Sequence, residues 1–507
     1  MAASKIDFQK ILEKEESLDP ENWEQLKKLG HEMVDIMMDH LRDLRNQPVW
    51  QKPSEKAKEF LDQPLPRLPQ QRNEVFRDFQ DHVLPYSKGN THPKFWGWVE
   101  GSGTPFGVLA DMLASGMNSN LGIGDHGAVY VEIQVLNWIK DFIGFPADAS
   151  GILVSGGSMA NFTCLAVARN SIPGNDLRNK GLFELPSRLM VYGSTETHSS
   201  IQKSIETLGL GNHSFVKIPV DKNFKIDMKL LKQAVEKDRQ RGRIPFCVVG
   251  NAGTVNTGAI DPLGQLGAFA KKEKMWFHVD GAFGAFATVL DEMKEEIEGI
   301  IEADSLALDL HKWMCMPYEA GCVLIRDKKL HRSAFYISSP YLVAHERGLP
   351  AGPDSFGNYG MQLSKGFSAL KIWMSIKEHG IEKFKRIIRQ NIAQAAYLED
   401  LIGKTAELEL MAPVSMNIVC FRYKHPDLSD SELNAINREI LMRLHENGIA
   451  ITTFTMLGHA YTLRAAIVNH RSRKEDFEEL VREVVKIGNQ LIKNGFKRNT
   501  IVDKLIQ

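Results

Sequence analysis

The sequence predicts an α/β protein, in which helices wrap a mostly parallel sheet and a smaller α+β domain follows. Residues 108–380 alternate short apolar runs with segments of helical periodicity, as the strands and helices of a parallel sheet do. From residue 381 onward, helical segments alternate with three short runs of strand character, at 417–423, 450–454 and 461–468. A chain of 507 residues is long enough for two or three domains around a large core.

Two segments of different character precede the sheet. A helix is predicted over residues 21–48, because apolar side chains recur there at helical spacing, and its Met-rich face is interpreted as core or subunit interface. Residues 51–72 are rich in Pro, Gln and charge and predict an extended arm. Farther on, Trp96 and Trp98 stand two residues apart, so an extended chain would point both rings the same way.

Composition and charge argue against several classes of protein. Lys plus Arg number 62 and Asp plus Glu 63, so neither nucleic acid nor an anionic membrane is an expected partner. No apolar run reaches the length of about 18 residues that a membrane span needs. The charged N-terminal stretch is unlike a signal peptide, so a cytoplasmic location is expected. The five cysteines form no CxxC pair, and no metal is expected.

A lysine between two predicted buried strands is the first candidate for chemistry. The strands are residues 306–308 and 322–325, and Asp309-Leu310-His311-Lys312-Trp313 lies between them. A lysine cation is costly to bury. Lys312 therefore either extends to solvent or pairs with Asp309, or it becomes neutral by bonding an aldehyde as an imine.

Three other stretches bear on this choice. Residues 153–161 predict a strand, a Gly-Gly-Ser turn and a helix start, a geometry that aims backbone N–H groups at a phosphate. Residues 275–282 predict a buried strand with Asp280 at its carboxyl end, where ligands of α/β sheets bind. Asp280 could cap a turn or hold a pyridinium nitrogen, as pyridoxal phosphate requires. His198, after a third strand, is either an ordinary helix-start residue or an aromatic plate over a cofactor ring.

These candidates follow one another in the order found in a pyridoxal-phosphate enzyme. The phosphate turn (residues 155–158) comes first, then the possible ring plate His198, the possible pyridinium partner Asp280 and the possible imine lysine Lys312. The sequence resembles the group II pyridoxal-phosphate-dependent decarboxylases, the family of aromatic L-amino-acid, histidine and glutamate decarboxylases. The motifs that carry the resemblance are His92-Pro93-Lys94-Phe95, Leu109-Ala110-Asp111-Met112-Leu113, Ser155-Gly156-Gly157-Ser158, Thr197-His198-Ser199-Ser200, His278-Val279-Asp280, His311-Lys312-Trp313 and Asn417-Ile418-Val419-Cys420-Phe421-Arg422. They span nearly the whole chain, and their conjunction is specific although each motif alone is not.

The resemblance implies fold type I, with a seven-stranded, mostly parallel sheet. It implies an N-terminal dimerisation region at 1–90, a large cofactor-binding domain at 91–380 and a small α+β domain at 381–507. The N-terminal region exchanges between subunits in the family, so a homodimer is expected. The implied cofactor is pyridoxal 5′-phosphate, and the implied partner is a small-molecule L-amino acid.

The resemblance also assigns roles to residues that match the family motifs. Lys312 would form the internal imine, Asp280 would keep the pyridine nitrogen protonated, and His198 would stack on the ring. The remaining cofactor-binding candidates are Gly157 and Ser158 at the phosphate, Ala282 below the ring, Thr254 beside the cofactor and His311 on the phosphate side. Trp98 and Gly101 would line the substrate pocket, although the Tyr-Phe-Pro-like triplet and the nearby Thr of the aromatic branch are missing here.

The family often has Asn where Asp309 stands. Because an extra carboxylate would repel a phosphate, Asp309 is expected to point elsewhere or to pair with a cation. No arginine stands in surroundings that suggest the carboxylate clamp of an aminotransferase. A decarboxylase would instead hold the substrate carboxylate perpendicular to the π system in a poorly solvated pocket.

The glycine- and proline-rich residues 336–366 match the mobile catalytic loop of the family. Tyr341 in this loop would protonate the carbanion left by CO2 and so release an amine. In the family, Tyr at this position accompanies amine production and Phe accompanies oxidative deamination to an aldehyde.

The sequence does not decide which amino acid is the substrate. Trp96 and Trp98 favour a bulky aromatic amino acid, whereas Gly101 and Gly366 leave room, so that glutamate or another acidic or small amino acid stays possible. An aminotransferase or an aldehyde-forming enzyme would share the cofactor site, and product analysis distinguishes them from a decarboxylase.

Overall fold

The computed structural model describes residues 9, 12–172, 174, 176–338 and 345–495. The chain divides into two compact units, one of residues 1–47 and 53–86 and one of residues 48–52 and 87–507. The predicted division into 1–90, 91–380 and 381–507 stays a prediction. Of the helices described, none combines the length and the apolar composition needed to cross a bilayer.

The first unit contains helices in the region predicted to hold one helix and an extended arm. Its α-helices are α2 (Trp23–Arg42), α3 (Glu55–Leu61) and α4 (Arg72–His82). Helix α2 confirms the predicted helix, although it ends six residues before Pro48. The prediction of an extended arm was wrong at α3. Ser54 caps this helix by accepting the N–H of Ala57 (3.1 Å), and good helix formers follow it.

The second unit contains, in its described part, a seven-stranded sheet of order β1-β7-β6-β5-β4-β2-β3. The strands are β1 (Ser150–Val154), β2 (Leu189–Ser194), β3 (Phe215–Ile218), β4 (Ile244–Asn251), β5 (Trp276–Asp280), β6 (Ser305–Asp309) and β7 (Gly321–Ile325). Strands β2 to β6 pair in parallel, whereas β7 runs antiparallel to both β1 and β6. The predicted mostly parallel sheet is confirmed.

Helices cover both faces of this sheet. On β5, Phe277 lies 3.4 Å from a Cβ placed on Gly267 of α11 (Leu263–Glu273). His278 and Asp280 instead bond to Asn161 of α7 (Gly157–Asn170). Because side chains alternate along a strand, α7 and α11 lie on opposite faces. Strand β6 is buried along its whole length, as expected of a strand covered on both sides.

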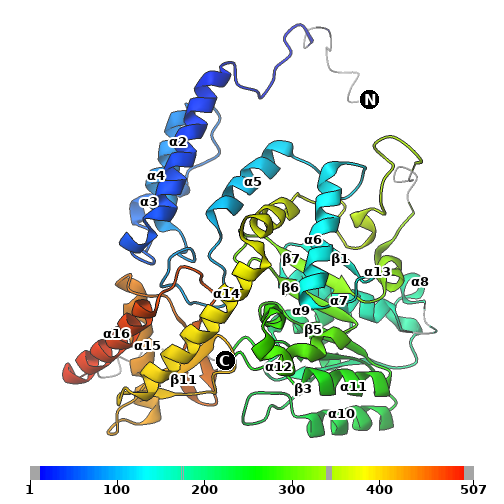
Figure 1. Ribbon diagram of the computed structural model, residues 1–507, viewed down its shortest axis with the longest axis vertical. Coiled ribbons are helices and arrows are strands. Elements are labelled where there is room, and N and C mark those ends of the chain that lie inside the picture. The colour runs from blue at the N-terminus through cyan, green and yellow to red at the C-terminus, as the bar shows by residue number, and fades with distance from the viewer. Residues whose placement is uncertain (1–8, 10–11, 173, 175, 339–344, 496–507) are drawn as a thin grey trace. The chain divides into compact units, whose positions relative to one another are not determined.

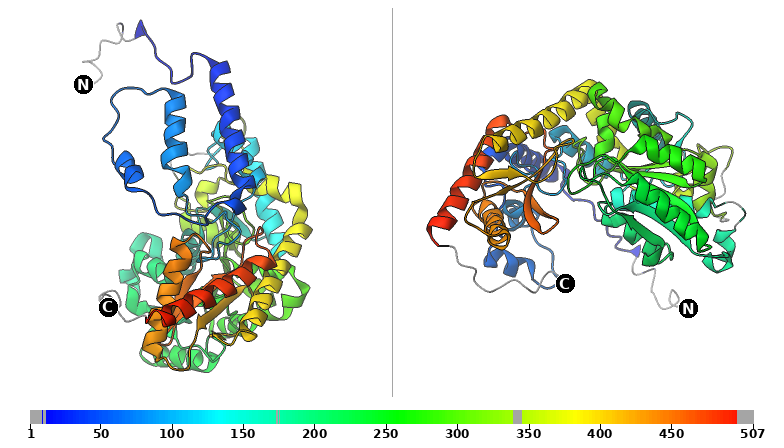
Figure 2. Two further views of the ribbon diagram at one scale, coloured as in Figure 1. Left: turned by 90° about the vertical axis from the view of Figure 1, so that its left-hand side faces the viewer. Right: turned by 90° about the horizontal axis from the view of Figure 1, so that it is seen from below.

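The remaining helices of the second unit lie around this sheet, except for α15 and α16, which belong to the smaller part of the fold (Figure 1). They are α5 (Pro105–Met117), α6 (Gly127–Ile143), α8 (Leu177–Lys180), α9 (Ser199–Thr207), α10 (Met228–Gln240), α12 (Lys294–Ile297), α13 (Lys328–Phe335), α14 (Ala369–Gly403), α15 (Asp430–Glu446) and α16 (Lys474–Lys493). Helix α14 contacts α5 and α6 as well as α16 and β8, and its yellow ribbon lies beside the red α16 in Figure 2. Gly380, with φ 65° and ψ 155°, interrupts its helical geometry.

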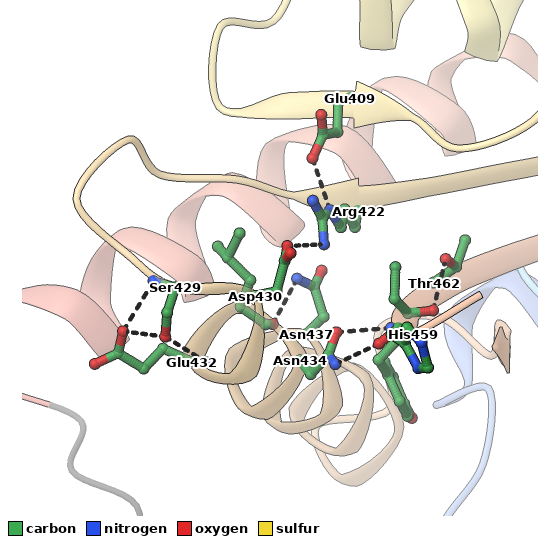
Figure 3. Close-up of polar contacts among 12 residues, drawn as sticks. Glu409, Arg422, Ser429, Asp430, Glu432, Asn434, Asn437, His459 and Thr462 are labelled. Carbon is green, nitrogen blue, oxygen red and sulfur yellow. Dashed lines mark hydrogen bonds and ion pairs between the residues drawn. The ribbon is translucent and has the colours of Figure 1, made fainter. Parts of the chain in front are cut away.

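The smaller part is an α+β arrangement with a four-stranded antiparallel sheet of order β10-β11-β9-β8. Its strands are β8 (Leu408–Leu410), β9 (Ile418–Tyr423), β10 (Thr453–Leu457) and β11 (Ala460–Ala466). Polar side chains fix α15 to this sheet (Figure 3). Arg422 joins Glu409 on β8 to Asp430 at the start of α15, and Asn437 donates to Tyr423 O (2.9 Å). Ser429 and Glu432 form a capping box at the start of α15.

Candidate active site

Lys312 lies in a tight turn directly after β6. Its N–H donates to Asp309 O (3.1 Å), and its Nζ lies 2.7 Å from Asp309 Oδ2. The Asp309 side chain is 2 % exposed and that of Lys312 is 23 % exposed. The ion pair that the sequence offered as one interpretation of Lys312 is therefore present. It holds the amine at the carboxyl end of β6, where an aldehyde could reach it.

Gly101 packs against the backbone of this same turn. A Cβ placed on Gly101 would lie 1.9 Å from His311 O and 2.4 Å from Lys312 O, so no other residue fits there without moving the turn. The sequence interpretation that Gly101 leaves room for a substrate was wrong, because the Lys312 turn fills that space. The structure thus brings Gly101 and Lys312 together, through a close backbone approach that only glycine allows.

Asp280 ends β5 and accepts two hydrogen bonds. Its Oδ2 accepts from Asn161 Nδ2 (2.9 Å) and its Oδ1 from the N–H of Ala282 (3.2 Å). Asn161 Oδ1 contacts His278 Nε2 (2.9 Å), and His278 Nδ1 contacts Ser305 Oγ (2.9 Å). Burial lowers the pKa of His278 to about 4, so its ring is neutral. The chain of bonds turns the Asn161 amide so that its NH2 group faces Asp280.

The same Asn161 amide links Asp280 to His198. Asn161 Nδ2 donates to Ser200 Oγ (2.9 Å), which lies 2.8 Å from His198 Nδ1. His198 is the N-cap of α9 and accepts the N–H of Ser200 (3.2 Å). Burial lowers the pKa of His198 and outweighs the opposite effect of Asp280, so the ring is a neutral, oriented plate. Sequence reasoning gave Asn161 and Ser200 no role, because their bonding depends on how α7 meets β5 and α9.

Helix α7 begins beside Asp309 and Ala282. A Cβ placed on Gly157 would lie 2.7 Å from Asp309 Oδ2 and 3.5 Å from Ala282 Cβ. Gly156, the N-cap, has no side chain to cap the helix, and Ser158 follows in the first turn. The predicted phosphate turn therefore adjoins the Lys312 turn. Asp309 pairs with a cation as expected, yet it does not point elsewhere, because its carboxylate faces the start of α7.

His311 is held on the side of the Lys312 turn that faces Gly156, the N-cap of α7. Its Nδ1 accepts the N–H of Ala320 (3.1 Å), and its Nε2 lies 3.8 Å from Asp309 Oδ2. A Cβ placed on Gly156 would lie 3.2 Å from His311 Cε1. Burial lowers the pKa of His311 to about 4. The ring packs against Tyr318, with centroids 4.3 Å apart, a neighbour that no sequence pattern indicated.

The two remaining candidates are Thr254 and Tyr341. Thr254 lies in the loop after β4, where its Oγ1 contacts Thr257 Oγ1 (3.1 Å) and accepts the N–H of Ala259 (3.2 Å), so these bonds close its own loop. Tyr341, the candidate proton donor, lies outside the described residues. Their predicted roles stay predictions.

Trp96 and Trp98 do not point the same way. Trp96 is fully buried, donates to Ser472 Oγ (3.0 Å) and stacks on Phe477, with ring centroids 4.8 Å apart. Trp98 is 51 % exposed, and Lys88 Nζ lies 4.4 Å from its ring centroid. The prediction failed because residues 97–99 form a turn, with Trp98 at φ 49°, rather than an extended strand.

A buried arginine, which the sequence did not reveal, lies behind Trp98. Arg464 on β11 is 3 % exposed and donates to Trp98 O (2.6 Å) and to Asn256 O (3.0 Å). Its Nη2 has no hydrogen-bond partner among the described residues, and burial lowers its pKa to about 10. The group is still a cation at neutral pH and has donors left for an anion. Its position follows from the pairing of β11 with β9, which no local pattern predicts.

The residues assembled here fit pyridoxal phosphate. Lys312 offers an amine, Asp280 offers a carboxylate acceptor for a ring N–H, and the neutral His198 offers a flat face. The start of α7 offers backbone N–H groups with no side-chain cap beside Gly157, the arrangement that favours a phosphate. Within the described residues, no cluster of three or more His, Cys, Asp or Glu side chains could hold a metal ion.

Comparison with known proteins gives one consistent family. The family model described as the pyridoxal-dependent decarboxylase conserved domain matches residues 53–424. An aromatic-L-amino-acid decarboxylase of Bacillus atrophaeus is 34 % identical over 472 residues, which cover 92 % of this chain and 96 % of that protein. Tyrosine decarboxylase 3 of Petroselinum crispum is 30 % identical over 470 residues, which cover 89 % of this chain and 90 % of that protein.

Solved structures agree on the fold. The crystal structure of Oryza sativa TDC with PLP and tryptamine superposes with a TM-score of 0.86, at 22 % identity. The superposition covers 94 % of this chain and 100 % of that chain. At this identity the likeness concerns the fold alone, and it confirms the predicted large domain with a smaller α+β domain.

Proposed function

The chain belongs to the pyridoxal-dependent decarboxylase family, and we propose that it converts an aromatic L-amino acid to the corresponding amine and CO2. It is a carboxy-lyase with pyridoxal 5′-phosphate as its cofactor. One observation carries the proposal: hydrogen bonds through Asn161 and Ser200 tie Asp280 to His198, and Lys312 lies within electrostatic range of His198.

Each site residue has a proposed task. When bound, pyridoxal phosphate supplies an aldehyde that bonds amines and a ring that withdraws electrons from the substrate Cα. Lys312 would hold the aldehyde carbon, Asp280 would hold the proton on the ring nitrogen, and His198 would cover one ring face. The other proposed contacts are Gly157 and Ser158 with the phosphate, His311 near it, Ala282 and Thr254 beside the ring, and Trp98 on the substrate side. Gly101 would line the substrate side through its backbone alone, because a side chain there would collide with the Lys312 turn.

The aromatic substrate rests on two supports. The relatives with the highest identities reported above are named for aromatic L-amino acids and for tyrosine. In addition, the half-exposed indole of Trp98 offers an apolar face that an aromatic side chain could cover. A hydrophobic wall of this kind also excludes water, which favours loss of the substrate carboxylate as neutral CO2.

An acidic L-amino acid is the second candidate substrate. The specific observation in its favour is the buried Arg464 guanidinium beside Trp98, with an Nη2 that has no partner among the described residues. An arginine with free donors can bind a side-chain carboxylate.

A panel of substrates separates these two candidates. Pure holoenzyme is given L-tryptophan, L-tyrosine, L-phenylalanine, L-glutamate and L-aspartate, and CO2 and amine are measured. We expect kcat/KM for the best aromatic substrate to exceed that for either acidic one by at least about 100-fold, a ratio that a shaped apolar pocket supports. A higher kcat/KM with glutamate or aspartate would contradict the aromatic proposal and favour the second candidate.

Tyr341 separates amine production from aldehyde production. We propose that its phenol delivers a proton to the substrate Cα after CO2 has left. Tyr341→Phe should then slow amine release and raise aldehyde, ammonia and peroxide, with cofactor binding nearly unchanged. Oxygen uptake and product analysis measure this, and wild-type amine release without oxygen uptake would remove Tyr341 from the mechanism.

We also propose a cytoplasmic homodimer. Its support is an apolar surface on α5, where Met112, Leu113 and Met117 are each about half exposed in the single chain. The double variant Met112→Glu, Met117→Glu should lower the mass found by light scattering to that of one chain. Met442→Glu places the same charge on an exposed methionine of α15 and should leave the dimer intact. A wild-type protein that is monomeric and fully active would refute the proposal.

A further inference from the structure

We propose that Asp309 couples cofactor binding to the uptake of a proton, because its carboxylate faces the helix end that would bind the cofactor phosphate. The inference rests on the proposed function for the location of that phosphate. It concerns a residue for which the family comparison predicted only that it would avoid the phosphate or pair with a cation.

The geometry places Asp309 in front of the first residues of α7. Its Oδ2 would lie 2.7 Å from a Cβ on Gly157, and its Oδ1 3.7 Å from a Cβ on Gly156. Oδ1 is buried and has no hydrogen-bond partner among the described residues, whereas Oδ2 pairs with Lys312 Nζ (2.7 Å). One oxygen of a buried carboxylate is thus unpaired next to the phosphate turn.

A carboxylate is stable at this place for the same reason that a phosphate would be. The first turn of a helix exposes N–H groups and carries a partial positive charge, and α7 has no side-chain cap. Asp309 therefore uses the electrostatic attraction that a phosphate would use. The two anions would share one helix end, and their repulsion is strong because Asp309 is almost completely shielded from water.

The groups that face Asp309 supply one cation. Lys312 is paired with it, so this one cation would face both the carboxylate and a phosphate. His311 (3.8 Å) and His198 have pKa values lowered by burial, so neither is charged at neutral pH. The pKa values of Tyr318 and Cys322, which also lie within electrostatic range of Asp309, are raised by burial, and both are neutral as well.

Protonation of Asp309 removes the repulsion between its carboxylate and the phosphate. The carboxylate takes one proton from solvent, loses its charge and gains an O–H that can donate to a phosphate oxygen. Asp309 ends a buried strand and cannot swing into solvent to achieve the same result. An asparagine at this position would supply an N–H donor of the same shape without needing a proton.

The test uses pyridoxine 5′-phosphate, which has the ring and the phosphate but no aldehyde, so that Lys312 cannot bond it. Its Kd for the cofactor-free full chain is measured by fluorescence quenching from pH 6.5 to 8.5, for wild type and for Asp309→Asn. We expect the ratio of wild-type Kd to variant Kd to rise about tenfold per pH unit, the slope of one linked proton. Titration of the ligand itself cancels in this ratio.

The control variant is Asp327→Asn, the same change at the N-cap of α13, and it should bind with the pH dependence of wild type. Calorimetry in two buffers of different ionisation enthalpy adds a measurement that depends on wild type alone. It should register the uptake of one proton per ligand in excess of the ligand's own protonation.

Two negative results have different meanings. Parallel Kd curves for wild type and Asp309→Asn, or no excess proton uptake, would overturn the role of Asp309 and leave the proposed function standing. Failure of wild type to bind both pyridoxine 5′-phosphate and pyridoxal phosphate would overturn the proposed function and this inference together.

Discussion

The buried ion pair of Glu132 and Lys365 is a sensitive point for perturbation. Glu132, on α6, is completely buried, and the Lys365 side chain is 8 % exposed. Oε2 of Glu132 pairs with Lys365 Nζ, and Oε1 accepts the N–H of Leu153 on β1 (3.2 Å). Leu153 lies two residues before Ser155, where the phosphate turn begins. The pair therefore ties the segment before α14 to the strand that leads into the cofactor site.

Glu132→Gln should destabilise the second unit by about 3–5 kcal/mol, the cost of leaving one buried charge without its partner. The glutamine can keep the hydrogen bond to Leu153, so the loss reports the unpaired ammonium of Lys365. Lys365→Met should lower the free energy of unfolding by a similar amount, because it leaves the buried Glu132 carboxylate without its partner. The double variant Glu132→Gln, Lys365→Met removes both charges and should lie within about 1 kcal/mol of wild type.

Urea unfolding followed by circular dichroism measures these free energies, on the transition that melts the seven-stranded sheet. A double-mutant cycle then gives the coupling between the two side chains. If either single variant lost less than about 1 kcal/mol, or if the double variant lost the sum of both, the charges would not be mutually dependent and the reasoning would fail. Cofactor titration should show weaker binding in the single variants, because β1 leads directly into the phosphate turn.

Three further predictions follow from the site and the core. Lys312→Ala should abolish turnover and the visible absorbance band of lysine-bound cofactor. Asp280→Ala should lower kcat/KM by about 100- to 10,000-fold, or about 3–5 kcal/mol of transition-state stabilisation, because the ring then lacks its proton-holding partner. His331 is neutral when folded, with a pKa lowered to about 4 by burial, so the unfolded chain binds more protons between pH 4 and 6.5 and stability falls as pH falls through that window. His331→Gln should remove up to about 1.4 kcal/mol per pH unit from this slope, as measured by urea unfolding at several pH values.

Matched variants control these three experiments. Lys312→Arg keeps a cation for Asp309 but cannot bond an aldehyde, so a normal absorbance band in either Lys312 variant would refute the lysine assignment. Asp280→Asn keeps the shape and loses the charge, and wild-type turnover in that variant would remove the proposed role. His459→Gln changes an exposed histidine and should leave the pH slope nearly unaltered, whereas an unchanged slope in His331→Gln would contradict its buried, neutral state.

The sequence by itself determined the elements whose signals are local. Strands, helices and their alternation follow from periodicity, and Gly157, Asp280 and Lys312 could be singled out because each lies where a strand ends. In a parallel sheet such ends gather at one edge, so the site could be located before its geometry was known. The resemblance to a family then supplied the cofactor and the expected reaction.

Only the tertiary structure decided the contacts between segments far apart in the chain. Glu132 meets Lys365, Asn161 meets Asp280, and Gly101 meets His311, and in each case the spacing carries no signal for the pairing. The turn at Trp98 likewise points its ring away from the direction of the Trp96 ring, whereas an extended chain would have pointed both the same way. The physical reason is that a buried polar group must find a partner or remain costly, and which partner it finds depends on how helices and strands pack, a property of the whole fold rather than of any stretch of sequence.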